Sequence, residues 1–511
     1  MRLEPVIGLE IHAQLKTHTK MFCACPNRGE LDPPNTNICP TCVGHPGTLP
    51  NINRSAVMNG LKIAKALGSQ LATRSKFDRK NYFYPDLPKG YQISQFDLPI
   101  AERGELILRI NESQDDEREF RVGITRVHLE EDAAKLQHSG TGDGKVSLVD
   151  YNRGGTPLVE IVTEPDLRSP AEAKAFLQEL RLMLRYLNVS DADMEKGNMR
   201  CDANISLREV PDNPLNEDWV KQFSPKTELK NLNSFRAVER ALEYEIKRQT
   251  KLWLDGKPPA IQSTRGWDDA RGVTIEQRTK EGSSDYRYFP EPDLPPMDLT
   301  EIREQISISE LPEARRLRFM EQYNLSRAEA KTMCEQKELA DFAERVFSEL
   351  DEWTSSVASA DPNIEPLTPE RRAKLVSGWL LTKLVGVMTE HKLDIRTVKI
   401  TPENFAELLT MVQTNKVTGP NALIILNEMT QAGADPSIIM EEKNLGQMND
   451  LSKLDKIVKQ VLTDNPPAVE DWRKGKTTAV QFLVGQVMKV SRGKAPPEEA
   501  RRLLEEELGK M

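Results

Sequence analysis

The stretch VIGLEIH at residues 6–12 is rich in β-branched and aliphatic residues and predicts a β-strand. Glu10 and His12 are two residues apart, so their side chains project from the same face of that strand. Further strand candidates in this part of the chain lie at 121–129, 146–151, 158–162 and 203–207. The glycine-rich segment 140–144 separates the first two of these, and we expect them to form a hairpin with a long loop.

Carboxylate side chains recur along these strand candidates. Glu160 lies in the otherwise apolar segment 158–162, where a carboxylate needs a partner, and Glu130 follows the candidate at 121–129. Several carboxylates and one imidazole on one face of a sheet can bind a magnesium ion, and phosphate oxygens then complete the coordination shell of the ion. Polar side chains paired with Arg or Lys have the same spacing, and spacing alone favours that plainer interpretation.

A change in periodicity divides the chain. Ser169, Pro170 and Glu172 form a helix-start pattern in the strand-rich first part, which ends in a proline-rich extended segment at 289–296. Beyond about residue 300, apolar residues recur at helical spacing and strand-type alternation disappears. The polar stretch 354–368 predicts a flexible loop. We expect three domains, namely mixed α and β structure at 1–296, a helical domain at 297–401 and a small helical tail at 402–511.

The length of 511 residues agrees with about three domains. The formal net charge is -9, and 29% charged with 38% hydrophobic residues is a mix typical of globular proteins. An acidic balance argues against general coating of nucleic acid, although one local basic patch can still meet such a partner. No run of about 18 apolar residues and no secretory signal pattern is present, so we expect a cytoplasmic protein without a membrane span.

Four of the six cysteines lie close together, as Cys23-x-Cys25 followed by Cys39-x2-Cys42. Two short thiolate pairs on separate turns can close a tetrahedral sulfur site, and thiolates select zinc over harder ions. Such a site leaves no position open for water, so we expect structural zinc. The alternative is four unrelated buried thiols.

Two segments place basic and amide side chains at alternating positions, where they can bind a polyphosphate or a carboxylate. The candidate residues are Arg200, Asp202, Asn204, Lys230 and Asn231. Neither a Walker A pattern nor a G-x-G-x-x-G motif opens a helix in the chain, and segment 140–144 is expected to be a surface loop. Any nucleotide site is therefore neither a P-loop nor a Rossmann site.

Two further stretches have more than one interpretation. Aromatic and basic residues interleave at 77–91, which suits either stacking on a nucleic-acid base or an internally packed aromatic loop. Residues 473–497 include six basic residues and no acidic one. Three of them, the tail basic residues, are Lys489, Arg492 and Lys494. The six basic residues form two clusters at the ends of one expected helix and can bind a phosphate backbone, or they can form a solvated face that the acidic helix after residue 497 neutralises.

Several long motifs resemble the GatB/GatE family, the B subunits of tRNA-dependent amidotransferases. Besides residues 6–12, the motifs are FDRKNYFYPDLPKGYQISQ at 77–95, HLEED at 128–132, VDYNR at 149–153, PLVEIV at 157–162, MRCDAN at 199–204, TELKNLNSF at 227–235, Thr264-Arg265 and DYRYFPEPD at 285–293. The resemblance spans nearly the whole chain.

The resemblance implies an α+β cradle similar to glutamine synthetase and guanidino kinases, with a large mixed sheet flanked by helices, followed by the helical domain and the tail. It also implies a complex of three different proteins, in which an amidase (the A subunit) releases ammonia from glutamine and the C subunit is small. The B subunit would use ATP and Mg²⁺ to phosphorylate the side-chain carboxylate of Glu-tRNA(Gln) or Asp-tRNA(Asn). Ammonia would then displace the phosphate.

Carried over to this sequence, the resemblance assigns magnesium to Glu10, His12, Glu130 and Glu160, which reverses the preference from spacing alone. It implies that the tail basic residues meet the tRNA body, and it supports a structural role for zinc. Two alternatives stay open. One is a stand-alone ligase like glutamine synthetase, and the other is a non-catalytic, zinc-bearing RNA-binding scaffold.

Overall fold

The computed structural model describes residues 2–28, 31–113, 116–139, 146–211, 223–279, 286–360, 367–448 and 451–510. The chain divides into two compact units, Met1–Pro312 and Glu313–Met511. The first unit contains the sheets, and the described part of the second is helical. Among the described helices, none combines the length and apolar composition that crossing a membrane requires.

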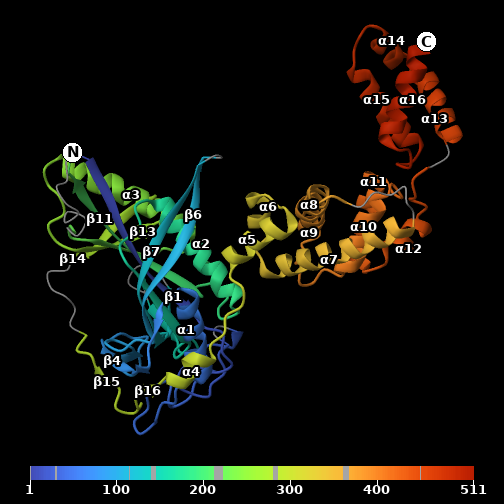
Figure 1. The fold of residues 1–511 in the computed structure, drawn as a ribbon. Coiled ribbons are helices and arrows are strands. Elements are labelled where there is room, and N and C mark those ends of the chain that lie inside the picture. Colours follow the sequence, from blue (N-terminus) through green and yellow to red (C-terminus); the bar gives the residue numbers. More distant parts are fainter. Residues whose placement is uncertain are drawn as a thin grey trace. The chain divides into compact units, whose positions relative to one another are not determined.

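A mixed sheet, with nine strands among the described residues, forms the centre of the first unit (Figure 1). Its strand order is β14 (Val273–Thr279), β13 (Ser263–Asp268), β12 (Thr227–Lys230), β11 (Met199–Val210), β1 (Arg2–Gln14), β10 (Pro157–Thr163), β7 (Asp116–Glu131), β6 (Ala101–Ser113) and β2 (Gln70–Leu71). β12 and β13 are parallel, and the other neighbouring pairs are antiparallel. The predicted strand at 6–12 is confirmed as part of the central β1, and an α+β architecture is confirmed with it.

Helices cover one face of this sheet. They are α1 (Arg54–Ala66), α2 (Pro170–Tyr186) and α3 (Phe235–Leu254). Odd-numbered side chains of β1, such as Ile7, Leu9 and Ile11, are buried with these helices in one hydrophobic core. Ser169 caps α2 as expected, since its side chain accepts a hydrogen bond from the backbone N–H of Glu172 at 3.2 Å. The even-numbered side chains of β1 therefore face away from the helices.

The predicted hairpin between 121–129 and 146–151 is wrong. The first candidate belongs to β7, which pairs with β6 and β10. The second is β9 (Val146–Asp150), and it pairs with β8 (Lys135–Ser139) in a separate two-stranded sheet. Segment 140–144, which was expected to be a surface loop, lies outside the described residues.

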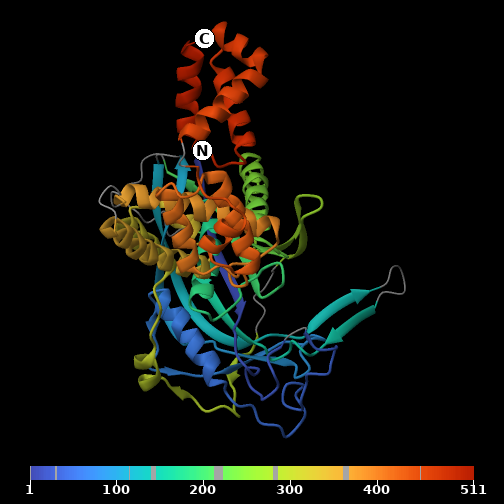
Figure 2. The same ribbon diagram turned by 90° about the vertical axis from the view of Figure 1, so that its right-hand side faces the viewer.

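Burial explains why β7 and β9 have different partners. Val127 of β7 is fully buried in the first core, as an inner strand of a covered sheet requires. Leu148 of β9 is 56% exposed. The teal hairpin formed by β8 and β9 projects from the first unit in Figure 2, so its side chains have little of the core to contact.

Two small sheets pair the proline-rich segment and the residues that follow it with earlier strands of the first unit. The pairs are β15 (Phe289–Pro290) with β4 (Asp78–Asn81), β4 with β5 (Tyr91–Ser94), and β16 (Met297–Asp298) with β3 (Arg74–Ser75). α4 (Thr300–Gln305) follows, and the flanking Leu299 and Ile306 are buried in the first core. Because the first compact unit continues to Pro312, the domain boundary expected after residue 296 stays a prediction.

The described residues of the second unit form two hydrophobic cores. Around the first core lie α5 (Pro312–Tyr323), α6 (Arg327–Met333), α7 (Lys337–Ala360), α8 (Pro369–Ser377), the π-helical segment η4 (Gly378–Leu384), α9 (Val385–Glu390), α10 (Pro402–Gln413), α11 (Gly419–Ala432) and α12 (Pro436–Glu442). Around the second lie α13 (Leu451–Asp464), α14 (Pro466–Arg473), α15 (Thr478–Val490) and α16 (Pro497–Lys510). The division expected between 401 and 402 falls inside the first of these cores, so it also stays a prediction.

The polar stretch 354–368 is not a loop from its beginning. α7 continues to Ala360, so the expectation of a loop is wrong for 354–360. The hydroxyl of Thr354 donates to the backbone oxygen of Leu350 at 2.7 Å, which satisfies the side chain inside the helix. A polar composition therefore does not end the helix here, because its hydroxyl groups find partners on the helix backbone.

A substitution at Gly104 on β6 tests how closely the first unit is packed. A Cβ atom there would lie 2.6 Å from the backbone oxygen of Leu67 and would also press on the hydroxyl of Ser69. We expect Gly104→Ala to lower the free energy of unfolding by about 1–3 kcal/mol in thermal or urea unfolding. The control is Gly386→Ala in α9, where nothing lies within 4 Å and alanine should stabilise by about 0.5–1 kcal/mol. An unchanged Gly104→Ala protein would contradict this description of the packing.

Candidate active site

Strand register gathers the predicted metal ligands on the face of the sheet that α1–α3 leave uncovered. His12 on β1 lies opposite both Glu160 on β10 and Arg200 on β11. Glu160 in turn lies opposite His128 on β7, and Glu130 follows two residues later on the same face. Residues that oppose each other on neighbouring strands point the same way, so these side chains form one polar cluster.

The side chains of this cluster are in contact. The Nε2 atom of His12 lies 3.4 Å from Glu130 Oε1 and 3.3 Å from Glu160 Oε2. Ligand atoms of Glu10, His12 and Glu160 all lie within 4.8 Å of one another, and so do those of His128, Glu130 and Glu160. The structure thus brings the four predicted magnesium residues together, while their binding of a metal stays a prediction. His128 was missed, although its strand spacing from Glu130 was a usable signal.

Electrostatics in the cluster favour a bound cation. Burial by itself would lower the pKa of His12, but its hydrogen bond with Glu160 and the surrounding carboxylate charges raise that pKa to about 9. Burial and the charge of Glu160 raise the pKa of Glu10. Burial opposes ionisation of Glu160 as well, yet His128 and His12 hold the pKa of Glu160 well below its usual range. A crowded, oxygen-rich donor set of this kind fits Mg²⁺.

A cavity of about 310 Å³ opens at the cluster. Besides Glu10, His12 and Glu130, its walls include Lys80, Tyr82, Arg200, Asp202, Lys230 and Tyr286. The Nζ atom of Lys230 lies 2.5 Å from Asp202 Oδ2, and Arg200 is ion-paired with Asp132. Three of the five predicted nucleotide-binding residues therefore line the same cavity as the carboxylates.

A second cavity, of about 1000 Å³, adjoins the first and shares Glu10 and Tyr286 with it. Asn204 lines this larger cavity, and its Oδ1 atom is buried without a hydrogen-bond partner among the described residues. A buried acceptor without a partner indicates a place for a ligand or a water molecule. Asn231 is different, because it lines neither cavity and has a positive φ of 62°.

A third cavity, of about 1280 Å³, lies past the other end of β1. Its lining is basic in part and includes Lys16, His18, Arg28, Lys135 and Arg153. β1 and the residues that follow it thus pass three cavities in turn, the largely apolar one at 6–10, the carboxylate one at 10–12 and the basic one at 14–18.

The aromatic stretch 77–91 contributes to the site and is also packed. The rings of Tyr82 and Tyr286 are 6.0 Å apart, and the Nζ atom of Lys80 lies 5.1 Å from the centre of the Tyr286 ring. Lys80 and Tyr82 nevertheless line the carboxylate cavity. Packing against Tyr286 and a place at the cavity wall are therefore compatible.

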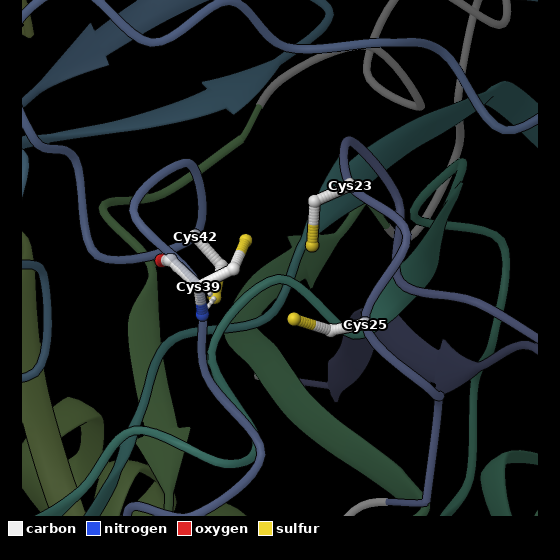
Figure 3. A group of neighbouring side chains, drawn as sticks. All are labelled: Cys23, Cys25, Cys39 and Cys42. Atoms are coloured by element: carbon white, nitrogen blue, oxygen red, sulfur yellow. Dashed lines mark hydrogen bonds between the residues drawn. The ribbon is translucent and has the colours of Figure 1, made fainter.

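The four predicted zinc ligands also converge. Figure 3 shows the sulfur atoms of Cys23, Cys25, Cys39 and Cys42 turned toward one another, and all four lie within 4.8 Å. A zinc ion with Zn–S bonds of about 2.3 Å holds its sulfur atoms about 3.8 Å apart, which lies within that limit, so the cluster fits zinc. A hydrogen bond with Cys23 is the main cause that lowers the pKa of Cys42 to about 5, whereas burial raises the pKa of Cys25 to about 11.

The tail basic residues lie at and just after the C-terminal end of one helix in the second unit. Lys489 lies in the last turn of α15, Arg492 is exposed with a positive φ of 53°, and Lys494 is half-buried. The acidic helix α16 pairs its carboxylates internally, for example Glu505 with Arg501 at 3.0 Å. Among the described residues, no ion pair neutralises the tail basic residues, so the alternative of neutralisation by α16 loses support.

Comparison with known proteins gives one consistent result. The family described as "GatB/GatE catalytic domain" matches residues 5–305, and that described as "GatB domain" matches residues 364–508. The B subunit of the aspartyl/glutamyl-tRNA(Asn/Gln) amidotransferase of Moorella thermoacetica is 46% identical over 99% of this chain and 100% of its own length. Proteins of the same name from Geobacillus kaustophilus and Thermomicrobium roseum are 46% and 47% identical, over 100% and 99% of both chains, respectively.

The sulfur cluster predicts a metal content. We expect the purified chain to carry about one zinc ion, measured by atomic spectroscopy, because four converging thiolates fill a tetrahedral shell. Cys42→Ser should lose most of this zinc. The matched control is Cys334→Ala, which changes a buried cysteine of the second unit and should leave the zinc content unchanged. Zinc-free wild-type protein from zinc-supplemented cells would contradict the assignment.

Proposed function

The chain belongs to the GatB/GatE family, and from this membership we propose that it is the B subunit of a glutamine-dependent amidotransferase. Its reaction would convert Glu-tRNA(Gln) or Asp-tRNA(Asn) to Gln-tRNA(Gln) or Asn-tRNA(Asn), with ATP as the energy source. The observation that carries this proposal is the convergence of Glu10, His12, Glu130 and Glu160 in one cluster, of which Glu10, His12 and Glu130 line a cavity of the sheet.

The chemistry requires an activated carboxyl group. A free carboxylate is a poor acyl donor, because its oxygen leaves badly. Transfer of the γ-phosphoryl group of ATP to the side-chain carboxylate gives an acyl phosphate and ADP. Ammonia then attacks the acyl carbon, the phosphate leaves with the bonding electrons, and the nitrogen loses a proton to give the amide.

The residues of the cluster have separate tasks in this reaction. Glu10, His12, Glu130 and Glu160 would hold Mg²⁺. The ion, when bound, neutralises phosphate charge and orients the transferred group. Arg200 and Lys230 supply further positive charge from the next two strands, with Asp202 fixing Lys230 in place. Asn204 and Asn231 would contact the nucleotide, and the support is stronger for Asn204 because its buried Oδ1 atom has no hydrogen-bond partner among the described residues.

The order of the three cavities supports an order of substrates. The 1000 Å³ cavity has walls that are more apolar than polar, with polar groups such as Asn204 and Ser206 among them, which suits a nucleoside. It adjoins the carboxylate cavity, where the phosphates would lie. The basic cavity at 14–18 has the charge that the phosphate backbone of a tRNA end requires. We therefore assign the nucleoside of ATP to the 1000 Å³ cavity and the aminoacylated end of the tRNA to the basic cavity.

The remaining assignments extend the same proposal. We propose two partner proteins, an amidase and a small third component, together with a cytoplasmic location and zinc in a structural role at the four cysteines. The sheet and its helices would form a cradle like that of glutamine synthetase and guanidino kinases. The tail basic residues, of which Lys489 and Arg492 are exposed, would meet the tRNA body.

Replacing one carboxylate tests the site. In the complex reconstituted with the amidase and the small component, we expect Glu160→Gln or Glu130→Gln to reduce ATP-driven transamidation by about 100- to 1,000-fold. Glutaminase activity should persist, because the neutral amide leaves the fold intact but lacks the charge that holds Mg²⁺. Glu119→Gln is the matched control, since Glu119 is exposed on the same strand as Glu130 and pairs only with Arg109 among the described residues.

Three results would contradict the proposal. Transamidation at the normal rate by Glu160→Gln would contradict the assignment of Glu160 to the magnesium site. ATP turnover with free glutamate and no tRNA would favour a stand-alone ligase. No ATP turnover with any charged tRNA and both partner proteins would favour a non-catalytic scaffold.

The raised pKa of His12 predicts a pH dependence. A histidine binds a metal only when neutral, so a pKa of about 9 in the metal-free protein means that Mg²⁺ must displace a proton at pH 7. We expect Mg²⁺ affinity to rise about tenfold from pH 7 to pH 8 and to level off above pH 9. Calorimetry in buffers of different ionisation enthalpy would measure the released proton. An affinity that does not change from pH 7 to pH 9 would contradict this role of His12.

A further inference from the structure

Lys20 is a buried lysine beside the cysteine cluster. Its side chain is only 1% exposed. The ammonium group donates to the backbone oxygen of Asn37 at 3.0 Å, to that of Tyr151 at 3.5 Å and to the sulfur of Cys42 at 3.9 Å. These three acceptors match the three hydrogens of the group.

The charge of Lys20 needs a negative partner. A buried ammonium group is costly unless an opposite charge lies near it. Among the described residues no carboxylate forms an ion pair with Lys20, and the sulfur of Cys42 is the acceptor that can carry charge. Four thiolates around a divalent ion have a net charge of about −2 by the ligand set alone. A lysine in contact with one of them neutralises half of that charge.

Lys20 also reaches the segment that leads to β10. Besides its bond to Tyr151, its stem lies against Gly155, where a Cβ atom would be 3.5 Å from Lys20 Cδ and 3.7 Å from Cys42 Cβ. The backbone of the next residue, Met21, donates to the Gly155 oxygen at 2.7 Å. Cluster and segment are therefore packed as one piece around this lysine.

The same segment holds a wall of the carboxylate cavity. Gly155 N–H donates to the backbone oxygen of Asp132 at 2.9 Å, and Asp132 N–H donates to that of Thr156 at 2.8 Å. The Asp132 carboxylate pairs with Arg200 and lies 3.6 Å from Arg153. A displacement of 151–156 would therefore move the partner of Arg200.

We propose that Lys20 is a positioning residue that neutralises the metal-loaded cysteine cluster and couples it to the Asp132–Arg200 wall of the carboxylate cavity. The effect on the metal is independent of the proposed reaction. The effect on turnover rests on it, so the two can fail separately.

The metal side of the proposal is tested with Lys20→Met in the full-length chain. Replacing a residue that hydrogen-bonds a metal ligand typically weakens metal binding about 10- to 100-fold, and we expect a loss in that range in competition with a chromogenic zinc chelator. In cobalt-substituted protein, loss of the hydrogen bond to Cys42 should move the thiolate-to-metal charge-transfer band to longer wavelength. Lys174→Met, which removes a lysine paired with Glu239 at 2.7 Å, is the control and should change neither.

Unchanged zinc affinity and an unchanged cobalt band in folded Lys20→Met would overturn the neutralising role. If Lys20→Met does not fold, Lys20→Gln replaces it, because glutamine keeps a donor and loses the charge. The proposal then expects weaker zinc binding with only part of the spectral shift, and wild-type affinity would overturn it.

The coupling is tested in wild-type protein without any variant. Removal of zinc by a chelator should raise hydrogen exchange at 151–156 and raise KM for the aminoacyl-tRNA more than it lowers kcat in the reconstituted complex. Exchange at 151–156 that stays the same after zinc removal would overturn the coupling, whatever the turnover does. A change in exchange without any change in KM would confine the role of Lys20 to the metal cluster and overturn its link to the cavity.

Discussion

The antiparallel pairing of β1 with β10 and β11 is the constraint on which the rest of the first unit depends. It places Ile7, Leu9 and Ile11 in the core with the helices, and it places Glu10 and His12 on the opposite face. Side chains alternate along a strand, so a slip of one residue would exchange the two sets and destroy core and site together. Fold and site are thus specified by the same hydrogen-bond ladder.

The second requirement is compensation of buried charge. Glu130 and Glu160 are almost fully buried, and such carboxylates are stable only beside positive groups. His12 supplies part of that charge in the protein alone, His128 lies against Glu160, and Arg200 and Lys230 line the same cavity from β11 and β12. Because His12 is also a candidate ligand, the cluster can exchange its proton for a metal ion without exposing its carboxylates. At the cysteine cluster, the buried charge of Lys20 and the negative charge of the thiolates compensate each other in the same way.

Local patterns in the sequence predicted those features of the structure that depend on residues near one another in the chain. The strand at 6–12, the cap at Ser169 and the convergence of the four cysteines were all predicted, because each depends on residues close in the chain. The partner of β7 was not, since a glycine-rich segment permits a hairpin but does not select which strand lies beside it. The spacing of His128 from Glu130 placed both residues on one strand face, but the contact of His128 with Glu160 depends on the β7–β10 register, which no single segment encodes.

The most direct test of this account is the position of the metal. Crystals of the reconstituted complex soaked with Mn²⁺ and a non-hydrolysable ATP analogue would give an anomalous signal from the ion. We predict one peak among the side chains of Glu10, His12, Glu130 and Glu160, with the phosphates of the analogue completing its shell. A peak elsewhere on the chain, with these four side chains free of metal, would contradict the central claim that the register of β1 builds the catalytic site.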